Sequence, residues 1–134
     1  MDTRFELKVG PSKIDGKGVF ALSQIPAKRK IGELGGEIIS IRKARKLAKE
    51  KKRIAIVELD DKHALYAAVA NNSLRYVNHS CSPNTYMRIF KHHVEFYSLK
   101  PIKNHEELTC NYGETHHEGK LKCRCNAPGC VGLI

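Results

Sequence analysis

Short apolar segments separated by glycines and polar turns make up most of the chain as far as residue 99, and they predict β-strands. The segments are residues 5–9, 19–22, 31–41, 54–59, 64–70 and 94–99. The longest segment contains Gly32, Gly35 and Gly36, which predicts two strands joined at a kink. Gly10-Pro11 predicts a turn after the first strand. The pattern therefore favours a mainly β domain.

Residues 42–53 have a different pattern, which predicts one helix. Ala44, Leu47 and Ala48 stand at i, i+3 and i+4. The same run holds eight basic residues and one acidic residue, so it carries most of the net charge. It is either a patch for phosphate or an acidic protein, or a solvated helix face. No aromatic residue interrupts the run, so it does not predict base stacking.

Length, charge and cysteine content narrow the class of protein. A chain of 134 residues predicts one domain. The formal net charge of +10 indicates acidic partners. No apolar run approaches the roughly 18 residues of a membrane span, and the start lacks the apolar stretch of a secretory signal. We therefore expect an intracellular protein without a membrane partner, in which five cysteines indicate metal or a reactive thiol.

The cysteines near the end of the chain give the sharpest chemical signal. Cys123, Cys125 and Cys130 lie within eight residues. Zinc prefers four thiolate or imidazole ligands, so three clustered thiols predict a zinc site that lacks one ligand. Cys81, Cys110 and seven histidines are the candidates for the fourth ligand. The fourth ligand must come from far along the chain, so the metal would pin the C-terminal segment to the body of the domain.

Three other segments are weak signals when each is taken alone. Residues 16–18 are a glycine-rich loop or an ordinary turn. Residues 78–84 are a polar loop after an apolar stretch, which suits either a ligand site or a surface turn. Residues 106–113 end in Tyr112 and Gly113, where the tyrosine is either a packed core ring or a functional group.

Taken together and in order, these segments resemble the SET-domain protein lysine methyltransferases. The matching segments are GKGVFA (16–21), GEIIS (36–40), RYVNHSCSPN (75–84), EELTCNYG (106–113) and CRCNAPGCVGLI (123–134). The resemblance implies small β-sheets with a C-terminal pseudoknot and a short helical insert. It implies a SET domain over residues 1–115, with the basic insert at about 42–56, and a post-SET zinc lobe over residues 116–134.

The same resemblance implies roles for individual residues. S-adenosylmethionine would lie along Lys17, Gly18 and Phe20, with Asn78 and His79 at its amino-acid and adenine ends, Leu133 or Ile134 packed on its adenine, and Arg75 bracing the pseudoknot. Tyr112 would be the catalytic residue and would orient the lysine amine and the methyl group, since a phenol with a pKa of about 10 is a poor base at neutral pH. One zinc ion would bind Cys81, Cys123, Cys125 and Cys130, leaving Cys110 spare.

Two departures from the family pattern concern the channel for the substrate lysine. Leu34 stands where the family usually has a tyrosine, and Cys110 stands where it has Phe or Tyr. Both changes remove bulk or a hydroxyl, so we expect a roomy channel that permits di- or trimethylation. Tyr66 or Tyr86 is the candidate for a replacement ring. A smaller departure is Asn104-His105, where the family usually has a glycine before the EEL segment. Asn104 tolerates a left-handed backbone, so we expect the turn to be kept.

The resemblance predicts an active enzyme that acts on a protein lysine, with a histone tail as the favoured substrate. The basic run at residues 42–53 would then contact nucleosomal DNA or an acidic flank of the substrate. Two alternatives stay open: a catalytically inactive SET-like binding module, and a basic zinc-stapled nucleic-acid-binding domain. A eukaryotic protein of this kind would act in the nucleus on chromatin, whereas a bacterial or viral one would be cytoplasmic or delivered to a host. Oligomeric state cannot be deduced from the sequence.

Overall fold

The structure is a computed structural model that describes residues 3–14, 16–50, 56–67 and 73–111. The elements in chain order are β1 (Leu7–Pro11), β2 (Lys17–Ala21), β3 (Lys30–Leu34), β4 (Glu37–Ser40), α1 (Ile41–Glu50), β5 (Ile56–Glu58), β6 (His63–Tyr66), the 3-10 helix η2 (Ser73–Tyr76), β7 (Asn78–His79), β8 (Thr85–Phe90), β9 (His93–Ser98) and β10 (Glu107–Cys110). The prediction of a mainly β fold with a short helical insert is confirmed. None of the described helices is long and apolar enough to cross a membrane.

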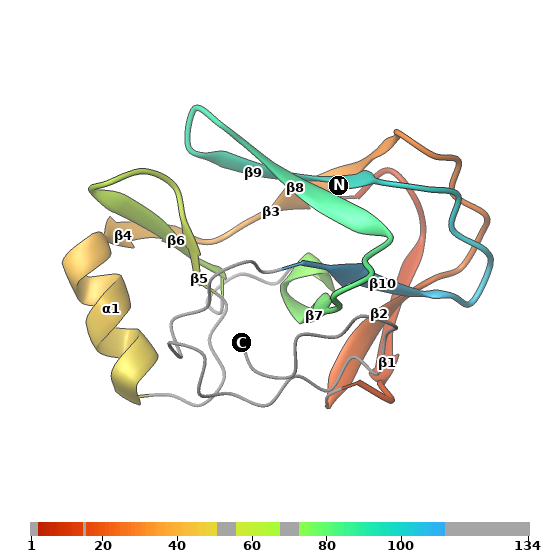
Figure 1. Cartoon of the computed structure of the whole chain (residues 1–134), viewed down its shortest axis with the longest axis horizontal. Helices are drawn as coiled ribbons and strands as arrows, with labels where there is room; N and C mark the ends of the chain where they lie inside the picture. The colour runs from red at the N-terminus through yellow and green to blue at the C-terminus, as the bar shows by residue number, and fades with distance from the viewer. Residues whose placement is uncertain (1–2, 15, 51–55, 68–72, 112–134) are drawn as a thin grey trace.

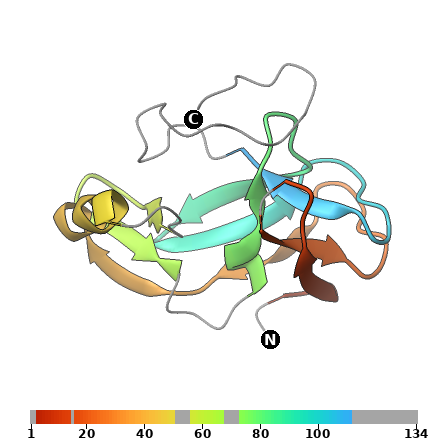
Figure 2. The same ribbon diagram turned by 90° about the horizontal axis from the view of Figure 1, so that it is seen from below.

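The strands form two sheets. The large sheet has seven strands in the order β1-β2-β10-β8-β9-β3, with β7 paired to β10 outside this path. The small sheet has the order β4-β6-β5, and α1 follows β4 directly. Figure 1 shows the small sheet and α1 at one end of the molecule, with β1 and β2 at the other end. Figure 2 shows the same division from below.

Each sheet has its own apolar core. The core of the large sheet includes the fully buried Val19, Ile31 and Leu108, which come from three different strands. The core of the small sheet is a separate cluster made by Ile39, Ile41, Ala44 and Ala64. Burial of apolar surface is the main favourable term in folding, so each cluster stabilises its own sheet. The small sheet also packs on the larger core, because Leu65 of β6 belongs to that cluster and Val57 of β5 packs against it.

The helix forms as the sequence predicts, and its basic face lies in solvent. Ile41 and Ala44 are buried on one side of α1, while Arg42, Arg45 and Lys46 are exposed on the other. Ser40 is the N-cap, since its Oγ accepts a hydrogen bond from the backbone N–H of Lys43 at 3.1 Å. The predicted helix extended to residue 53, and residues 51–53 lie outside the described part of the chain.

Two turns differ from the sequence predictions. The predicted turn at Gly10-Pro11 is wrong, because β1 continues to Pro11, which pairs with Lys17. The chain reverses between Pro11 and Lys17, which pair with each other. Proline is tolerated because β1 lies at the end of the sheet order. Before β10 it is His105, with φ of 70°, and not Asn104 that adopts the left-handed backbone. The predicted kink within residues 31–41 is confirmed, with Gly36 at φ 156° between β3 and β4.

Candidate active site

Three segments that are far apart in the sequence meet where β10 passes between its neighbours. β10 pairs in parallel with β7, placing Thr109 opposite Asn78 and Cys110 opposite His79. Along the residues just before this pairing, β10 pairs antiparallel with β2, placing Leu108 opposite Val19. We call β2, β7 and β10 the strand crossing. It brings together the glycine-rich loop, the polar loop and the segment leading to Tyr112 (Figure 1).

The side chain of Asn78 links all three strands of the crossing. Its Nδ2 donates to the carbonyl oxygen of Lys17 at 3.0 Å and to Oε2 of Glu107 at 3.1 Å. The hydroxyl of Ser12 donates to the same carboxylate, with oxygen–oxygen distances of 2.8 and 2.9 Å. Hydrogen bonds to a charged carboxylate are stronger than neutral ones, so Glu107 is a firm anchor for the loop before β2.

Gly18 of β2 lies directly against the carboxylate of Glu107. A Cβ atom at this position would collide with that carboxylate and would lie 3.0 Å from the Cβ of Ser12. Glycine therefore allows the backbone of β2 to approach β10. Sequence analysis selected Gly18 and Asn78 through the resemblance, but it did not select Ser12 or Glu107, whose roles depend on this three-dimensional contact.

Asn84 is a second linking residue that sequence analysis missed as a functional candidate. This side chain is only 4% exposed. Its Nδ2 donates to the carbonyl oxygen of Glu107 and to a carboxylate oxygen of Glu106, both at 2.8 Å. Its Oδ1 accepts from the backbone N–H of Thr109 at 2.8 Å. Asn84 thus satisfies buried backbone groups on β10 just before the site, and its only sequence signal was its place at the end of the NHSCSPN segment.

Cationic and aromatic groups from η2 and from the start of β2 gather beside the crossing. The guanidinium of Arg75 donates to the hydroxyl of Tyr76 and lies over its ring, 4.5 Å from the centroid. The Lys17 Nζ lies 5.7 Å from the same centroid. Both distances fall within the range of cation–π attraction. This arrangement suits the bracing role expected for Arg75 and places Lys17 at the rim of the crossing.

Comparison with known proteins identifies this arrangement. Residues 16–113 match the SET domain. The chain belongs to the SET-domain family. A histone-lysine N-methyltransferase specific for H3 lysine-4 from Schizosaccharomyces pombe is 33% identical over 138 residues, which cover 96% of this chain and 15% of that protein. The histone-lysine N-methyltransferase ATXR7 from Arabidopsis thaliana is 34% identical over 131 residues, covering 91% of this chain and 9% of that protein.

A third relative, the histone-lysine N-methyltransferase set-2 from Caenorhabditis elegans, is 30% identical over 137 residues, covering 96% of this chain and 9% of that protein. The chain therefore spans less than a sixth of the length of these relatives. The SET domain is what they share with it, and the β10–β7 pairing corresponds to the pseudoknot that the resemblance led us to expect.

Two of the three expected channel residues of the SET domain lie in one cluster. Leu34 and Cys110 are 8% and 2% exposed, and both belong to the core of the large sheet. Tyr66 is half-buried and packs against the core of the small sheet instead. Burial raises the pKa of the Cys110 thiol to about 11, so this thiol stays protonated at neutral pH. The expectation that Cys110 is the spare cysteine stays a prediction.

His79 is the last residue of β7, and Cys81 follows it two residues later. His79 is 6% exposed, and burial lowers the pKa of its imidazole, which favours the neutral ring. His79 Nε2 lies 3.4 Å from the Sγ of Cys81, which is half-buried. Six other residues with expected roles lie outside the described residues: Tyr112, Cys123, Cys125, Cys130, Leu133 and Ile134. Their expected roles stay predictions.

Proposed function

We propose that this SET domain is a protein-lysine N-methyltransferase that transfers a methyl group from S-adenosylmethionine to the ε-amine of a lysine, with a histone lysine as the favoured substrate. The observation that carries the proposal is the strand crossing, which links the motif segments of Lys17, Asn78 and Glu107 through one side-chain amide. The names of the relatives support the same reaction class. A histone substrate implies action in the nucleus.

The groups at the crossing suit the cofactor. S-adenosylmethionine carries an amine and a carboxylate at one end and an adenine at the other. Lys17 offers an exposed ammonium for a carboxylate, and the Lys17 carbonyl and the Asn78 amide offer an acceptor and a polar partner beside it. Phe20 is half-buried on the same strand and offers an apolar surface. Leu133 is proposed to cover the adenine, which requires the C-terminal lobe to close the pocket.

The chain's own part in the reaction is to position the lysine and to exclude water. When bound, S-adenosylmethionine supplies the methyl group on a sulfonium. The substrate amine must be neutral, although the pKa of a free lysine is about 10.4. A channel lined by buried apolar groups such as Leu34 and Cys110 lowers that pKa, because burial disfavours the ammonium. Tyr112 is proposed to orient the neutral amine toward the methyl group, an effect of positioning.

The channel is proposed to accept a partly methylated lysine. Leu34 and Cys110 bring less bulk than the tyrosine and the Phe or Tyr of the family pattern. Tyr66 is a better candidate than Tyr86 for a replacement ring. Its carbonyl oxygen lies against Gly36, two residues from Leu34, whereas the Tyr86 ring stacks on Tyr97 at 5.5 Å near the opposite end of β3. We expect di- or trimethyl-lysine as product, and a product that stops at monomethyl would contradict this.

A zinc ion is proposed to hold residues 116–134 together as a post-SET lobe. The donor set fits, because four cysteines suit a closed tetrahedral zinc site. Cys81 is half-buried and stands at the crossing, so it would tie Cys123, Cys125 and Cys130 to the cofactor side of the domain. His79 Nε2 beside Cys81 Sγ would then donate to a ligand thiolate, as outer-sphere partners commonly do. Zinc content that falls in Cys81→Ser would support this proposal.

The basic face of α1 is proposed to contact nucleosomal DNA. Arg42, Arg45, Lys46 and Lys49 line one shallow hollow together with Lys62. Clustered cations that neutralise phosphates release counterions, which makes binding strongly dependent on salt. Loss of binding to nucleosomes in Arg45→Glu/Lys46→Glu, with methylation of a free histone peptide retained, would support the contact.

Mass spectrometry after incubation with S-adenosylmethionine tests the proposed function directly. The substrates are nucleosomes, free histones and a mixed protein lysate, and Tyr112→Phe is the control. We expect added mass in steps of about 14 Da, one per methyl group, which weakens in the control. No added mass on any substrate, with cofactor binding retained, would favour the inactive binding module. Salt-dependent DNA binding without affinity for the cofactor would favour the nucleic-acid-binding domain.

A further inference from the structure

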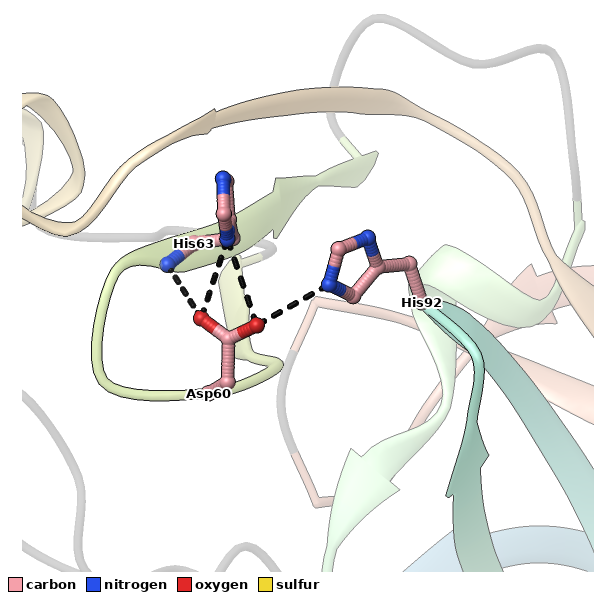
Figure 3. A group of neighbouring side chains, drawn as sticks. All are labelled: Asp60, His63 and His92. Atoms are coloured by element: carbon pink, nitrogen blue, oxygen red, sulfur yellow. Dashed lines mark hydrogen bonds and ion pairs between the residues drawn. The ribbon is translucent and has the colours of Figure 1, made fainter.

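Two turns from different sheets meet at a group of three side chains, Asp60, His63 and His92 (Figure 3). Asp60 lies in the turn between β5 and β6, and His63 is the first residue of β6. His92 lies in the turn between β8 and β9 of the large sheet. Each of the three side chains is 43% exposed, so solvent and dissolved ions reach the group.

The two imidazoles share one carboxylate. His63 Nδ1 lies 3.1 Å from Oδ1 of Asp60, and His92 Nε2 lies 2.9 Å from Oδ2. One ligand atom from each residue lies within 4.8 Å of the other two. Tetrahedral zinc holds its nitrogen and oxygen ligands at about 2.0–2.2 Å, which separates neighbouring ligand atoms by roughly 3.3 Å. Small rotations of the side chains would therefore bring all three ligands onto one ion.

The carboxylate is fixed in place before any ion binds. The backbone N–H groups of Lys62 and His63 donate to Oδ1 of Asp60 at 2.8 and 2.7 Å. These bonds, that of Lys62 foremost, together with the His92 ring, hold the pKa of the Asp60 carboxyl well below its usual range. An ionised and oriented carboxylate lowers the cost of ordering a metal ligand.

The turn that carries His92 adopts an unfavourable backbone. Lys91 and His92 have φ of 48° and 65°, which is the left-handed region. Tight hairpin turns of this kind favour Asn-Gly or Asp-Gly, because the left-handed backbone is energetically unfavourable for side chains larger than glycine. The conformation directs the His92 ring across to the small sheet, where its centroid lies 4.9 Å from that of His63. Unfavourable backbone conformations often occur at functional positions.

We propose that Asp60, His63 and His92 form a divalent transition-metal site, of the kind that takes zinc, which joins the small sheet to the β8–β9 hairpin. Two imidazole nitrogens and one carboxylate oxygen are a donor set that zinc accepts, and a fourth position stays open to water. The site is distinct from the cysteine site, since it uses no thiol. Its affinity is expected to be lower, because Lys62 and Lys91 bring positive charge beside two of the ligands.

The test compares variants of the zinc-loaded full chain. A further zinc titration is followed by calorimetry and native mass spectrometry in the natural sequence, His92→Asn and the neighbouring control His93→Asn. Asn tolerates the left-handed backbone, so His92→Asn keeps the turn. We expect one additional zinc in the natural sequence and in His93→Asn, and a dissociation constant raised at least about tenfold in His92→Asn.

Two readouts distinguish this site from the cysteine site. Cys81→Ser should retain the additional zinc, and the imidazole nitrogen resonances of His63 and His92 should shift with the added ion while that of His105 does not. Equal zinc uptake in the natural sequence and His92→Asn would overturn the proposal and leave the cluster as an ion-paired contact. Loss of the additional zinc in both His92→Asn and His93→Asn would overturn the assignment to this cluster.

Discussion

The strand crossing and the small sheet are stabilised in different ways. In the crossing, hydrogen bonds join residues far apart in the sequence. Asn84 joins Thr109 in the interior, and Asn78 joins Lys17 at the surface. A buried polar group that loses its hydrogen-bond partner destabilises the fold by its full desolvation penalty. Each bond in the crossing therefore depends on the others.

The small sheet depends on local contacts instead. Ser40 caps the helix that follows it, Asp60 accepts bonds from the backbone N–H groups of Lys62 and His63, and Ile39 packs on Ile41 and its neighbours. Its outer face is cationic and exposed. A change on the α1 face should remain local, because only the opposite face of β6, through Leu65, belongs to the large-sheet core. A change in the crossing should instead spread across β2, β7 and β10. The difference separates the part of the domain that forms the proposed active site from the part that presents a surface to partners.

Replacing Asn84 should have the largest effect on stability. Asn84→Ala leaves the N–H of Thr109 and the carbonyl of Glu107 buried without this partner. At about 1–3 kcal/mol for each such group, we expect a loss of about 4 kcal/mol in the free energy of unfolding. Urea unfolding measures this loss. Asn104→Ala, at an exposed position, is the matched control and should change the free energy of unfolding by less than about 0.5 kcal/mol.

The fold class and the outline of the site could be predicted from the sequence because both are expressed in local patterns. Apolar alternation marks strands, and the basic run with Ala44 and Leu47 on one face marks the helix. The family resemblance then joined Gly18 and Asn78 to one site. The structure adds the reason for Gly18, which is the approach of Glu107.

The parts that could not be predicted depend on contacts between distant residues. Glu107 stands in a segment with two adjacent glutamates, and no local pattern indicates which one turns toward Asn78. His92 lies 32 residues after Asp60, so their contact exists only once two sheets are placed side by side. The left-handed residue before β10 was expected at Asn104, but the turn places it at His105, where propensity alone would not have selected it.

Gly36 joins β3 of the large sheet to β4 of the small sheet, and its replacement should loosen the small sheet without loosening the strand crossing. A Cβ atom there would lie 2.5 Å from the carbonyl oxygen of Tyr66, at a φ of 156°. We expect Gly36→Ala to cost about 2–3 kcal/mol. Hydrogen exchange should show faster opening of β4 and β6, with β10 still protected. Gly10→Ala is the control, since its nearest neighbour is the Phe20 ring at 3.9 Å. If hydrogen exchange in β10 of Gly36→Ala quickened as much as in β4 and β6, the independence of the two regions would be contradicted.

The buried thiol of Cys110 should make the crossing sensitive to alkaline pH. Its pKa is raised from 9.0 to about 11 in the folded protein, so the unfolded chain loses this proton first as pH rises. The stabilisation of the fold by the protonated thiol is therefore fully present below pH 9. About 2 kcal/mol of the free energy of unfolding is lost between about pH 9 and pH 11. Cys110→Ala should flatten this part of the stability profile, measured by urea unfolding at each pH. An unchanged slope would show that Cys110 ionises freely in the folded state.

The smallest effect is expected at the cap of α1. Ser40→Ala removes the acceptor for the Lys43 N–H and should cost about 1 kcal/mol or less, since the site is exposed. Hydrogen exchange should quicken in the first turn of α1 and stay unchanged in β10. Ser40→Asp should preserve the cap and add a favourable charge at the helix N-terminus. A loss as large as that of Asn84→Ala would mean that the helix supports the crossing, because a purely local cap contributes no more than its own turn of helix.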